Sequence, residues 1–556
     1  MESSTKDGPV LARPDLDRLQ SYMNARQIGA GLQWLDLHRS EFEGLRPDTP
    51  DAFAILVCLM QWVDVGWDGL PLVRSFVGSL PVEAHSELRL LDYLRLSVAQ
   101  GMVHMHDQEP DAAIRRFELA LPLLREACRD RLLLALAHFW KAHCHRKKAE
   151  YDLARTHINE ARAIAIEAET APFVSVMRVL ESWLWFQQQD LRQAVTTLQE
   201  AETVLRHTDD YVTLGNLYSG FGRIARREGR YEQALEFFAR AAEQYRQRDP
   251  LHRNLARSLA HMAYVKRLIA RRLQHNMESE IARRRKGAVS GGESAADSAA
   301  TRGHCERLRQ EAFLELDRAG SIYGTRHAHG TATVRVYRGY LYLDRGELDR
   351  AELEAAEAFR LGEEKQDFII MARARLLESL VENAKHEEGI EDPANPIIHA
   401  QRADDYAKEA LSFARSTEDN RLIAHACILQ GLTLSGDYLN DLDGARKYCE
   451  EAAHHLKPGA HDYLWEDFET LRARILRGGN VDATLKRLSQ GLVGEKSFQQ
   501  ITEDFAGIII PKVWEQEGRK VSGVARRLSI SPKKVRRILR RAGLDARPNK
   551  LPAGGA

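Results

Sequence analysis

The chain has 556 residues, with 80 basic residues balanced by 80 acidic ones, and 44% of it is hydrophobic. This length is large for one compact core and predicts several domains or an extended repeat array. The longest apolar run, residues 52–60, is far too short to span a membrane, which takes about 20 apolar residues. The six cysteines are scattered without a CxxC pair, which argues against a disulfide framework.

The N-terminal sequence MESSTKDGPVLARPD lacks the apolar core of a signal peptide. We therefore expect a cytoplasmic protein whose residues 1–14 are disordered. Residues 15–477 are predicted to form amphipathic helices joined by short polar turns, and strand-like alternation is nearly absent. Within them, residues 15–80 are expected to form one or two divergent helical pairs with Trp34, Trp62 and Trp67 in their core.

The segment 218–242, YSGFGRIARREGRYEQALEFFARAA, is the best single repeat. Gly222 is predicted to lie where two helices approach, Gly229 in the turn, and Tyr231 at the start of the second helix. The segment 339–358 has small residues at the same offsets. Both segments resemble the tetratricopeptide repeat (TPR), and the resemblance implies an α-solenoid whose groove binds a protein or peptide.

A pair of alanines seven residues apart recurs along the chain, mostly every 39 to 42 residues. Seven residues are about two helical turns, so each pair lies on one helix face and allows a close partner helix. The period exceeds the TPR period of about 34 residues and indicates longer helices. The pairs are Ala113/Ala120, Ala154/Ala161, Ala194/Ala201, Ala234/Ala241, Ala312/Ala319, Ala351/Ala358, Ala403/Ala410 and Ala445/Ala452.

Two insertions interrupt this spacing. Residues 283–303 are rich in Gly, Ser and Ala without apolar periodicity and are expected to form a disordered loop, and residues 387–396 a shorter acidic loop. Before both insertions the chain offers one aromatic candidate for ligand contact, or for packing between repeats: the group Trp183, Trp185 and Phe186.

Residues 478–496 are expected to join the repeats to a second domain, residues 497–547, followed by a disordered tail, 548–556. Segment 521–544, VSGVARRLSISPKKVRRILRRAGL, has the layout of a helix-turn-helix. Ser531 is a good N-cap, Pro532 suits the first helical position, and Gly543 suits the helix end. The small Ala525 would allow the two helices to cross, and the expected apolar seam consists of Val524, Leu528, Ile530, Val535 and either Ile538 or Leu539.

Charge is distributed unevenly between the two parts of the chain. Residues 512–547 hold twelve Lys or Arg against three Asp or Glu, a balance of +9, so the rest of the neutral chain carries −9. A basic tail on an acidic body is typical of a nucleic-acid-binding module fused to a protein-binding one. A solvated basic helix face is the alternative, but here the cap, turn, seam and charge coincide.

Residues 518–544 resemble the C-terminal helix-turn-helix of the Fis family, also carried by enhancer-binding bacterial activators. The shared features are the Gly518 loop, Ala525, the turn at 529–531, the basic helix and Gly543-Leu544. A resolvase-like helix-turn-helix is a weaker match. The resemblance implies binding of double-stranded DNA, usually as a homodimer on a pseudo-palindromic site. Two departures are Ser529, where the family usually has Gly, and Pro511, which is expected to kink or restart the preceding helix.

The predicted recognition helix should place its early residues at base edges and its flanks on phosphates. The base-edge candidates are Ser531, Lys533, Lys534 and Arg537. The phosphate candidates are Arg536, Arg540, Arg541, Arg519 and Lys520.

No catalytic constellation stands in a convincing context, and no cofactor or metal site is expected. Residues 494–497 lack the Gly-Lys step of a phosphate loop. The trio His143-Cys144-His145 points in diverging directions on a helix and cannot converge on one ion. We therefore expect an all-α protein, a TPR-like α-solenoid with a small helix-turn-helix domain, acting as a non-enzymatic bacterial DNA-binding regulator. The alternative is a TPR adaptor or scaffold subunit of a larger, nucleic-acid-associated complex.

Overall fold

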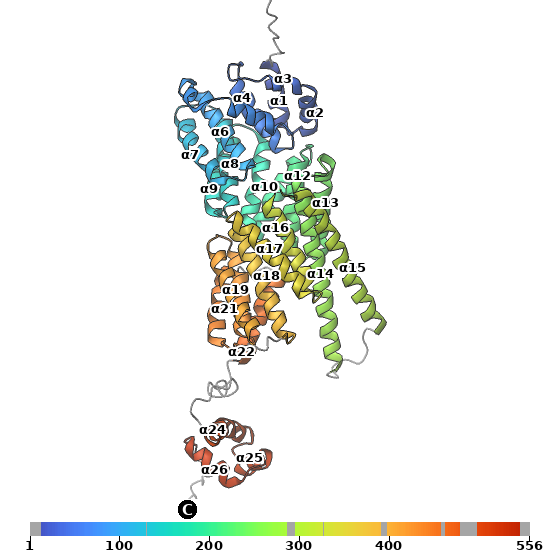
Figure 1. Cartoon of the computed structure of the whole chain (residues 1–556), viewed down its shortest axis with the longest axis vertical. Coiled ribbons are helices and arrows are strands. Elements are labelled where there is room, and N and C mark those ends of the chain that lie inside the picture. The colour runs from blue at the N-terminus through green and yellow to red at the C-terminus, as the bar shows by residue number, and fades with distance from the viewer. Residues whose placement is uncertain are drawn as a thin grey trace, which may run out of the picture. The chain divides into compact units, whose positions relative to one another are not determined.

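The computed structural model describes residues 13–128, 130–285, 295–325, 327–390, 397–456, 462–478 and 497–544, and these ranges contain helices and turns without a strand. The chain divides into two compact units. Residues 1–471 are called the repeat unit below, and residues 472–556 the tail unit. Both are shown in Figure 1.

The N-terminal part of the repeat unit is a helical layer whose core contains all three predicted tryptophans. Trp34, Trp62 and Trp67 are buried, and Gly31 lies so close to Trp62 that a Cβ atom there would overlap its ring. The elements are α1 (Arg13–Ala25), α2 (Ile28–Leu37), α3 (Arg39–Glu43), α4 (Ala52–Asp64), α5 (Leu70–Gly78) and the 3-10 helix η1 (Val82–Glu87).

From residue 90 onward the helices pack in successive pairs, each helix against the next in sequence. The first helices of the pairs are α6 (Leu90–His106), α8 (Arg131–Lys147), α10 (Ala171–Gln187), α12 (Tyr211–Arg227), α14 (Arg253–Arg285), α16 (Ala328–Leu343), α18 (Phe368–Glu387) and α20 (Asn420–Leu434). The second helices are α7 (Pro110–Glu126), α9 (Tyr151–Glu167), α11 (Leu191–Leu205), α13 (Tyr231–Arg248), α15 (Ala295–Tyr323), α17 (Leu348–Glu364), α19 (Ile398–Arg415) and α21 (Leu442–His455), and α22 (Tyr463–Gly478) follows.

The recurring alanine pairs lie at the contacts within these helix pairs. Every alanine of the eight predicted pairs is fully buried, and each pair lies on a second helix. Gly222 on α12 is equally constrained, because a Cβ atom there would come within 2.9 Å of the Phe238 ring on α13. The prediction of a TPR-like α-solenoid is therefore confirmed.

The turns between helices are set by local chemistry. Gly229 and Gly346 have φ of 73°, a left-handed conformation that glycine adopts without steric cost, and each stands two residues before a second helix. Several first helices begin at an aspartate whose carboxylate accepts a hydrogen bond from a free backbone amide. These N-caps are Asp130, Asp210, Asp367 and Asp419.

Segments far apart in sequence also meet within the repeat unit. The Glu418 amide donates to the Ala149 carbonyl at 3.3 Å, and the Glu418 carboxylate accepts from the Asp152 amide at 3.2 Å. Near the N-terminus, Arg26 donates to Asp210 at 2.7 Å. These contacts tie early helix pairs to later ones.

The prediction that residues 283–303 form a disordered loop is wrong at both ends of this segment. Helix α14 extends to Arg285, and α15 already begins at Ala295. These long helices pack against each other, and Cys305 and Leu308 of α15 are buried with Ala270 of α14. Packing therefore extends the helices into a segment whose composition favours a loop.

Other expectations lie partly outside the described residues. These are the centre of the insertion at 286–294, most of the acidic loop at 391–396, most of the junction at 479–496, and both termini. Helix α18 runs to Glu387, at the start of the predicted acidic loop, and Gly389 follows with φ of 69°.

The alanine contacts make a testable prediction. Replacing Ala351 with Leu should lower the free energy of unfolding by about 1–3 kcal/mol, because the added atoms have no space between α17 and its partner. The matched control is Leu353→Ala on the same helix, which is 71% exposed and should change stability by less than about 0.5 kcal/mol. Thermal denaturation of both variants measures the difference, and equal melting temperatures would contradict the packing account.

Candidate functional site

In the described residues 497–544 of the tail unit, three helices share one small apolar core. They are α24 (Phe498–Gln516), α25 (Val521–Arg527) and α26 (Pro532–Arg541), and each contacts the other two. Leu528 and Ile530 are half-buried at the edge of this core. Its buried residues are Ile510, Trp514, Val524, Ala525, Val535, Ile538 and Leu539.

The turn between α25 and α26 has the geometry expected from the sequence. Ser529 has φ of 54°, so this position is left-handed and costs a non-glycine residue about 1 kcal/mol. The Ser531 hydroxyl accepts from the Lys534 amide at 3.2 Å, and Pro532 is the first residue of α26. The predicted N-cap is confirmed.

The end of α26 is closed by two further hydrogen bonds. The Gly543 amide donates to the Arg540 carbonyl at 3.1 Å, and the Leu544 amide donates to the Leu539 carbonyl at 2.9 Å. Gly543 has φ of 72°, as this type of helix end requires. Helix α26 is thus fixed at both ends by its own sequence.

The buried residues of α26 determine which face points to solvent. Val535, Ile538 and Leu539 lie on the core side, so the basic side chains lie on the opposite side. Lys534 is half-buried. The exposed predicted site residues are Ser531, Lys533, Arg536, Arg537, Arg540 and Arg541 on or beside α26, and Arg519 and Lys520 before α25.

Some of these cations are already paired within the tail unit. The Glu503 carboxylate on α24 accepts from Arg537 at 2.9 Å and from Arg541 at 2.8 Å. The remaining cations of α26, Lys533, Lys534, Arg536 and Arg540, have no carboxylate within 4.0 Å in the described part of the chain. The free positive charge is therefore centred on these four side chains.

Of the two expectations for Pro511, a kink or a restart of the helix, the restart is wrong. Helix α24 continues through Pro511 without interruption, and its start is fixed by a capping box between Ser497 and Gln500. A proline inside a helix costs about 3 kcal/mol. Ile510 and Trp514, on either side of Pro511, are buried in the tail core, and this packing holds the helix together.

In the repeat unit, the three aromatic residues near position 185 separate into two environments. Phe186 is buried, whereas Trp183 and Trp185 are half-buried. Arg146 lies over the Trp183 ring at 5.3 Å, and Arg155 lies over the Trp185 ring at 5.5 Å. All three aromatic residues thus pack against the apolar core of the repeats. The two tryptophans also contact guanidinium groups, which sequence reasoning missed.

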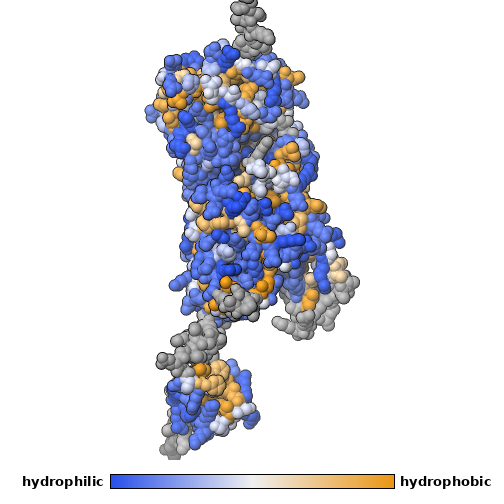
Figure 2. All heavy atoms as spheres, in the orientation of Figure 1, coloured by the Kyte–Doolittle hydropathy of each residue, from blue (hydrophilic) through white to orange (hydrophobic). Residues whose placement is uncertain are grey.

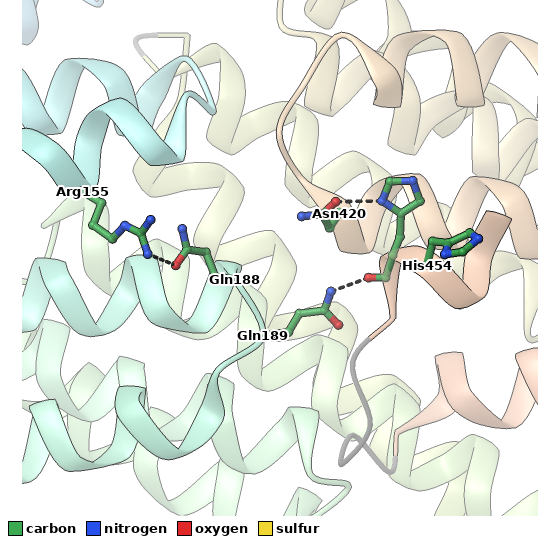
Figure 3. A pocket seen from close by; sticks show the side chains of 6 residues that line it. Arg155, Gln188, Gln189, Asn420 and His454 are labelled. Carbon is green, nitrogen blue, oxygen red and sulfur yellow. Dashed lines mark hydrogen bonds between the residues drawn. The ribbon is translucent and has the colours of Figure 1, made fainter.

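A pocket of about 350 Å³ lies where early and late helix pairs of the repeat unit meet (Figure 3). Its polar groups largely bond to one another: Arg155 donates to Gln188 at 3.0 Å, and His455 and Asn420 share a hydrogen bond of 2.7 Å. Gln189 donates to the His455 carbonyl. These mutual bonds leave the pocket few groups for a ligand.

Neither a metal site nor a membrane span is evident in the described residues. They contain no group of three or more His, Cys, Asp or Glu side chains that could hold a metal ion. Within the same ranges, the helices are too short or too polar to cross a bilayer.

No family model matches the chain, and no curated protein matches it. Among solved structures, a Rap protein complexed with competence and sporulation factor is 14% identical, covers 72% of this chain and 98% of its own, and has a TM-score of 0.47. The apo quorum sensor NprR from B. thuringiensis is 13% identical, with coverages of 80% and 98% and a TM-score of 0.37.

A signal transduction ATPase with a tetratricopeptide repeat sensor, from Pyrococcus horikoshii, is also similar. It is 13% identical, with coverages of 85% and 68% and a TM-score of 0.36. All three TM-scores are below 0.5, so the repeat architecture is assigned from the helix pairs of this chain itself. The repeat unit is a TPR-like α-solenoid.

The cap of α26 makes a testable prediction. Replacing Ser531 with Ala should destabilise the start of α26 by about 1 kcal/mol, because the Lys534 amide loses its acceptor. Hydrogen–deuterium exchange of the α26 amides should then become about fivefold faster. Ser522→Ala, at an exposed position on α25, is the control. Unchanged exchange in the Ser531 variant would show that the hydroxyl does not hold the helix.

Proposed function

We propose that this protein is a DNA-binding regulator that acts without catalysis of its own. In this proposal the tail unit binds double-stranded DNA and the repeat unit binds a protein or peptide. The observation that carries the proposal is the solvent-facing side of α26. Its four cations Lys533, Lys534, Arg536 and Arg540 have no carboxylate partner among the described residues, and the helix is held by its own small core.

The dimensions of α26 suit the major groove. A helix of ten residues is about 15 Å long, and the groove is about 12 Å wide. In the proposed complex the first turn, with Ser531, Lys533, Lys534 and Arg537, lies at base edges. The phosphates are bound by Arg536, Arg540, Arg541, Arg519 and Lys520.

Glu503 adjusts the strength of this interaction. Its carboxylate pairs with Arg537 and Arg541, so these two guanidinium groups must exchange one acceptor for another when they bind DNA. The carboxylate would also lie close to phosphate groups of like charge. Glu503 therefore limits affinity.

A dimer would increase affinity, because one recognition helix makes few contacts. Helix α24 supports this part of the proposal. Phe498 and Phe505 are 84% and 50% exposed, and Ile501 and Ile508 recur at helical spacing on the same side. Apolar residues are visible on the surface of the tail unit in Figure 2.

The repeat unit supplies the partner-binding part of the proposal. Stacked helix pairs form extended surfaces suited to peptides and protein segments. Figure 2 shows mainly hydrophilic residues on the visible face of this unit, with scattered apolar ones. A polar surface of this kind favours a partner that is recognised through hydrogen bonds and charge.

The first functional prediction concerns α26. Changing Arg536 and Arg537 together to Glu should weaken binding to duplex DNA at least tenfold and lower its salt dependence, because each lost phosphate contact reduces the slope by about one unit. Fluorescence anisotropy with fragments from upstream of the gene measures both quantities. Arg192→Glu with Arg240→Glu, exposed on α11 and α13, is the charge-matched control. Wild-type binding by the α26 variant would refute the assignment, and equal affinity for unrelated duplexes would favour the adaptor hypothesis.

The second prediction concerns Glu503. Replacing it with Gln should strengthen DNA binding several-fold, because two guanidinium groups lose their internal acceptor and become available to phosphates. The dependence of the binding constant on salt concentration should steepen by up to about two units. Glu515→Gln removes the same charge from an exposed position on α24 and should have a smaller effect. If the two variants bind equally, net charge alone explains the change and the pairing with Glu503 has no role.

A further inference from the structure

Five arginines on three first helices of the repeat unit lack carboxylate partners among the described residues. Arg146 lies on α8, Arg223 and Arg226 lie on α12, and Arg253 and Arg257 lie on α14. We call these five residues the arginine cluster. In the described ranges, no carboxylate oxygen lies within 4.0 Å of any of them. This contrasts with the many paired arginines elsewhere in the unit, such as Arg267, which contacts Asp344 at 2.6 Å.

Neutral groups accept hydrogen bonds from only some of the donors of the arginine cluster. Arg257 donates to the side-chain oxygens of Asn216 at 3.1 Å and Asn254 at 2.8 Å. The Nε atom of Arg146 and the Nη1 atom of Arg226 are buried and have no acceptor. A buried donor without an acceptor costs free energy, so the protein itself satisfies the guanidinium groups of Arg146 and Arg226 only incompletely.

The charges of the cluster act on one another. Burial, then Arg257, lowers the pKa of Arg223 to about 9. Burial, then Arg257 and Arg253, lowers the pKa of Arg146 to about 10. The hydrogen bond from Arg257 of α14 to Asn216 of α12 brings these two helices of the cluster together, and the charges of Arg257 and Arg253 also act on Arg146 of α8.

This region is open to solvent. Arg253 and the neighbouring Lys147 are exposed, and Arg146 and Arg223 are half-buried, yet surrounding protein lowers the pKa of all four. Asp64 on α4 is a carboxylate that acts on Arg146 and Arg253 from a longer distance, and burial raises its pKa. The surroundings of the arginine cluster thus have an excess of positive charge.

Arg227 provides a second, independent observation beside the cluster. It lies one turn after Arg223 on α12, is only 6% exposed, and stacks on Phe186 at 4.1 Å. Its Nη1 atom has no hydrogen-bond partner. Burial lowers its pKa, and the nearby Arg421 adds to the effect.

The chemistry around the cluster favours carboxylates on a peptide over nucleotides. Two aromatic rings that contact the cluster, Trp183 and Tyr264, already have guanidinium groups of Arg146 and Arg226 on their faces, which leaves less room for base stacking. Packed helices lie about 8–10 Å apart, and an extended peptide advances about 3.3 Å per residue. Acidic side chains three residues apart would therefore match arginines on neighbouring helices.

We propose that the arginine cluster binds the carboxylate groups of an extended acidic peptide. This inference rests on the proposed function, in which the repeat unit binds a peptide or protein segment, and it names the chemical class of that partner. Arginine is suited to this role because its planar group can donate two parallel hydrogen bonds to one carboxylate.

The test uses the full chain and two fluorescein-labelled peptides. One peptide repeats Glu-Ser-Gly four times, and the other replaces each Glu with Gln. Fluorescence anisotropy should show binding of the glutamate peptide and at least tenfold weaker binding of the glutamine peptide. Inorganic phosphate, ATP and a single-stranded oligonucleotide are added as competitors, and we expect each to compete less well than unlabelled glutamate peptide.

Variants of the cluster distinguish a binding role of the arginines from a structural one, because peptide affinity and melting temperature should change in opposite directions. Arg223→Gln with Arg253→Gln should weaken binding of the glutamate peptide at least tenfold and raise the melting temperature of the free protein, because two repelling charges are removed. Arg192→Gln, exposed on α11, is the control and should change neither quantity. A variant that loses both stability and binding would show that the arginines are structural and would overturn the proposal.

The remaining outcomes separate this inference from the proposed function. Equal binding of the two peptides would overturn carboxylate recognition while leaving peptide binding in place. Stronger binding of the oligonucleotide or of ATP than of the glutamate peptide would also overturn it. DNA binding by the cluster variants, measured in parallel, should equal that of the wild type. Failure of wild-type protein to bind DNA would contradict the proposed function without affecting the peptide result.

Discussion

The close contact between the two helices of each pair is the constraint on which the repeat unit depends. Alanines at seven-residue spacing are fully buried along the second helices, and a larger side chain would separate the pairs. Repetition of this contact stacks the pairs and brings their first helices side by side. Side chains such as Arg146, Arg223 and Arg253 can then act on one another's charge, although each belongs to a different pair.

The two basic surfaces of the chain differ in their physical setting. On α26 the cations face solvent, and Glu503 and the helix caps fix their arrangement. Interactions of such exposed charges are strongly screened by salt. In the arginine cluster the guanidinium groups are partly surrounded by protein, so their mutual repulsion is larger and their interaction with an anion is screened less. The same residue type thus lies in two different electrostatic settings within one chain.

Much of the architecture could be predicted from the sequence because it follows from local patterns. The alanine spacing identified the helix pairs, and Ser531, Pro532 and Gly543 identified the ends of α26. Predictions failed where packing outweighed local preference. Helix α24 continues through Pro511 because Ile510 and Trp514 are buried on either side of it, and α15 begins in a segment of loop-like composition because it packs on α14.

The arginine cluster could not be predicted from the sequence. Arg146 and Arg257 are more than a hundred residues apart, and each lies in an ordinary amphipathic helix that also contains other charged residues. Only the folded arrangement shows that carboxylates are missing around them. The pairing of Glu503 with Arg537 and Arg541 could not be predicted either, because it connects α24 and α26 across the tail core.

The most direct test of two separate cationic sites is chemical modification of arginines by phenylglyoxal, quantified residue by residue by mass spectrometry. The account predicts that duplex DNA protects Arg536 and Arg540 and leaves Arg223 and Arg253 reactive. It also predicts that the acidic peptide protects Arg223 and Arg253 and leaves α26 reactive. Protection of the cluster by DNA, or no protection of α26 by DNA, would contradict the account.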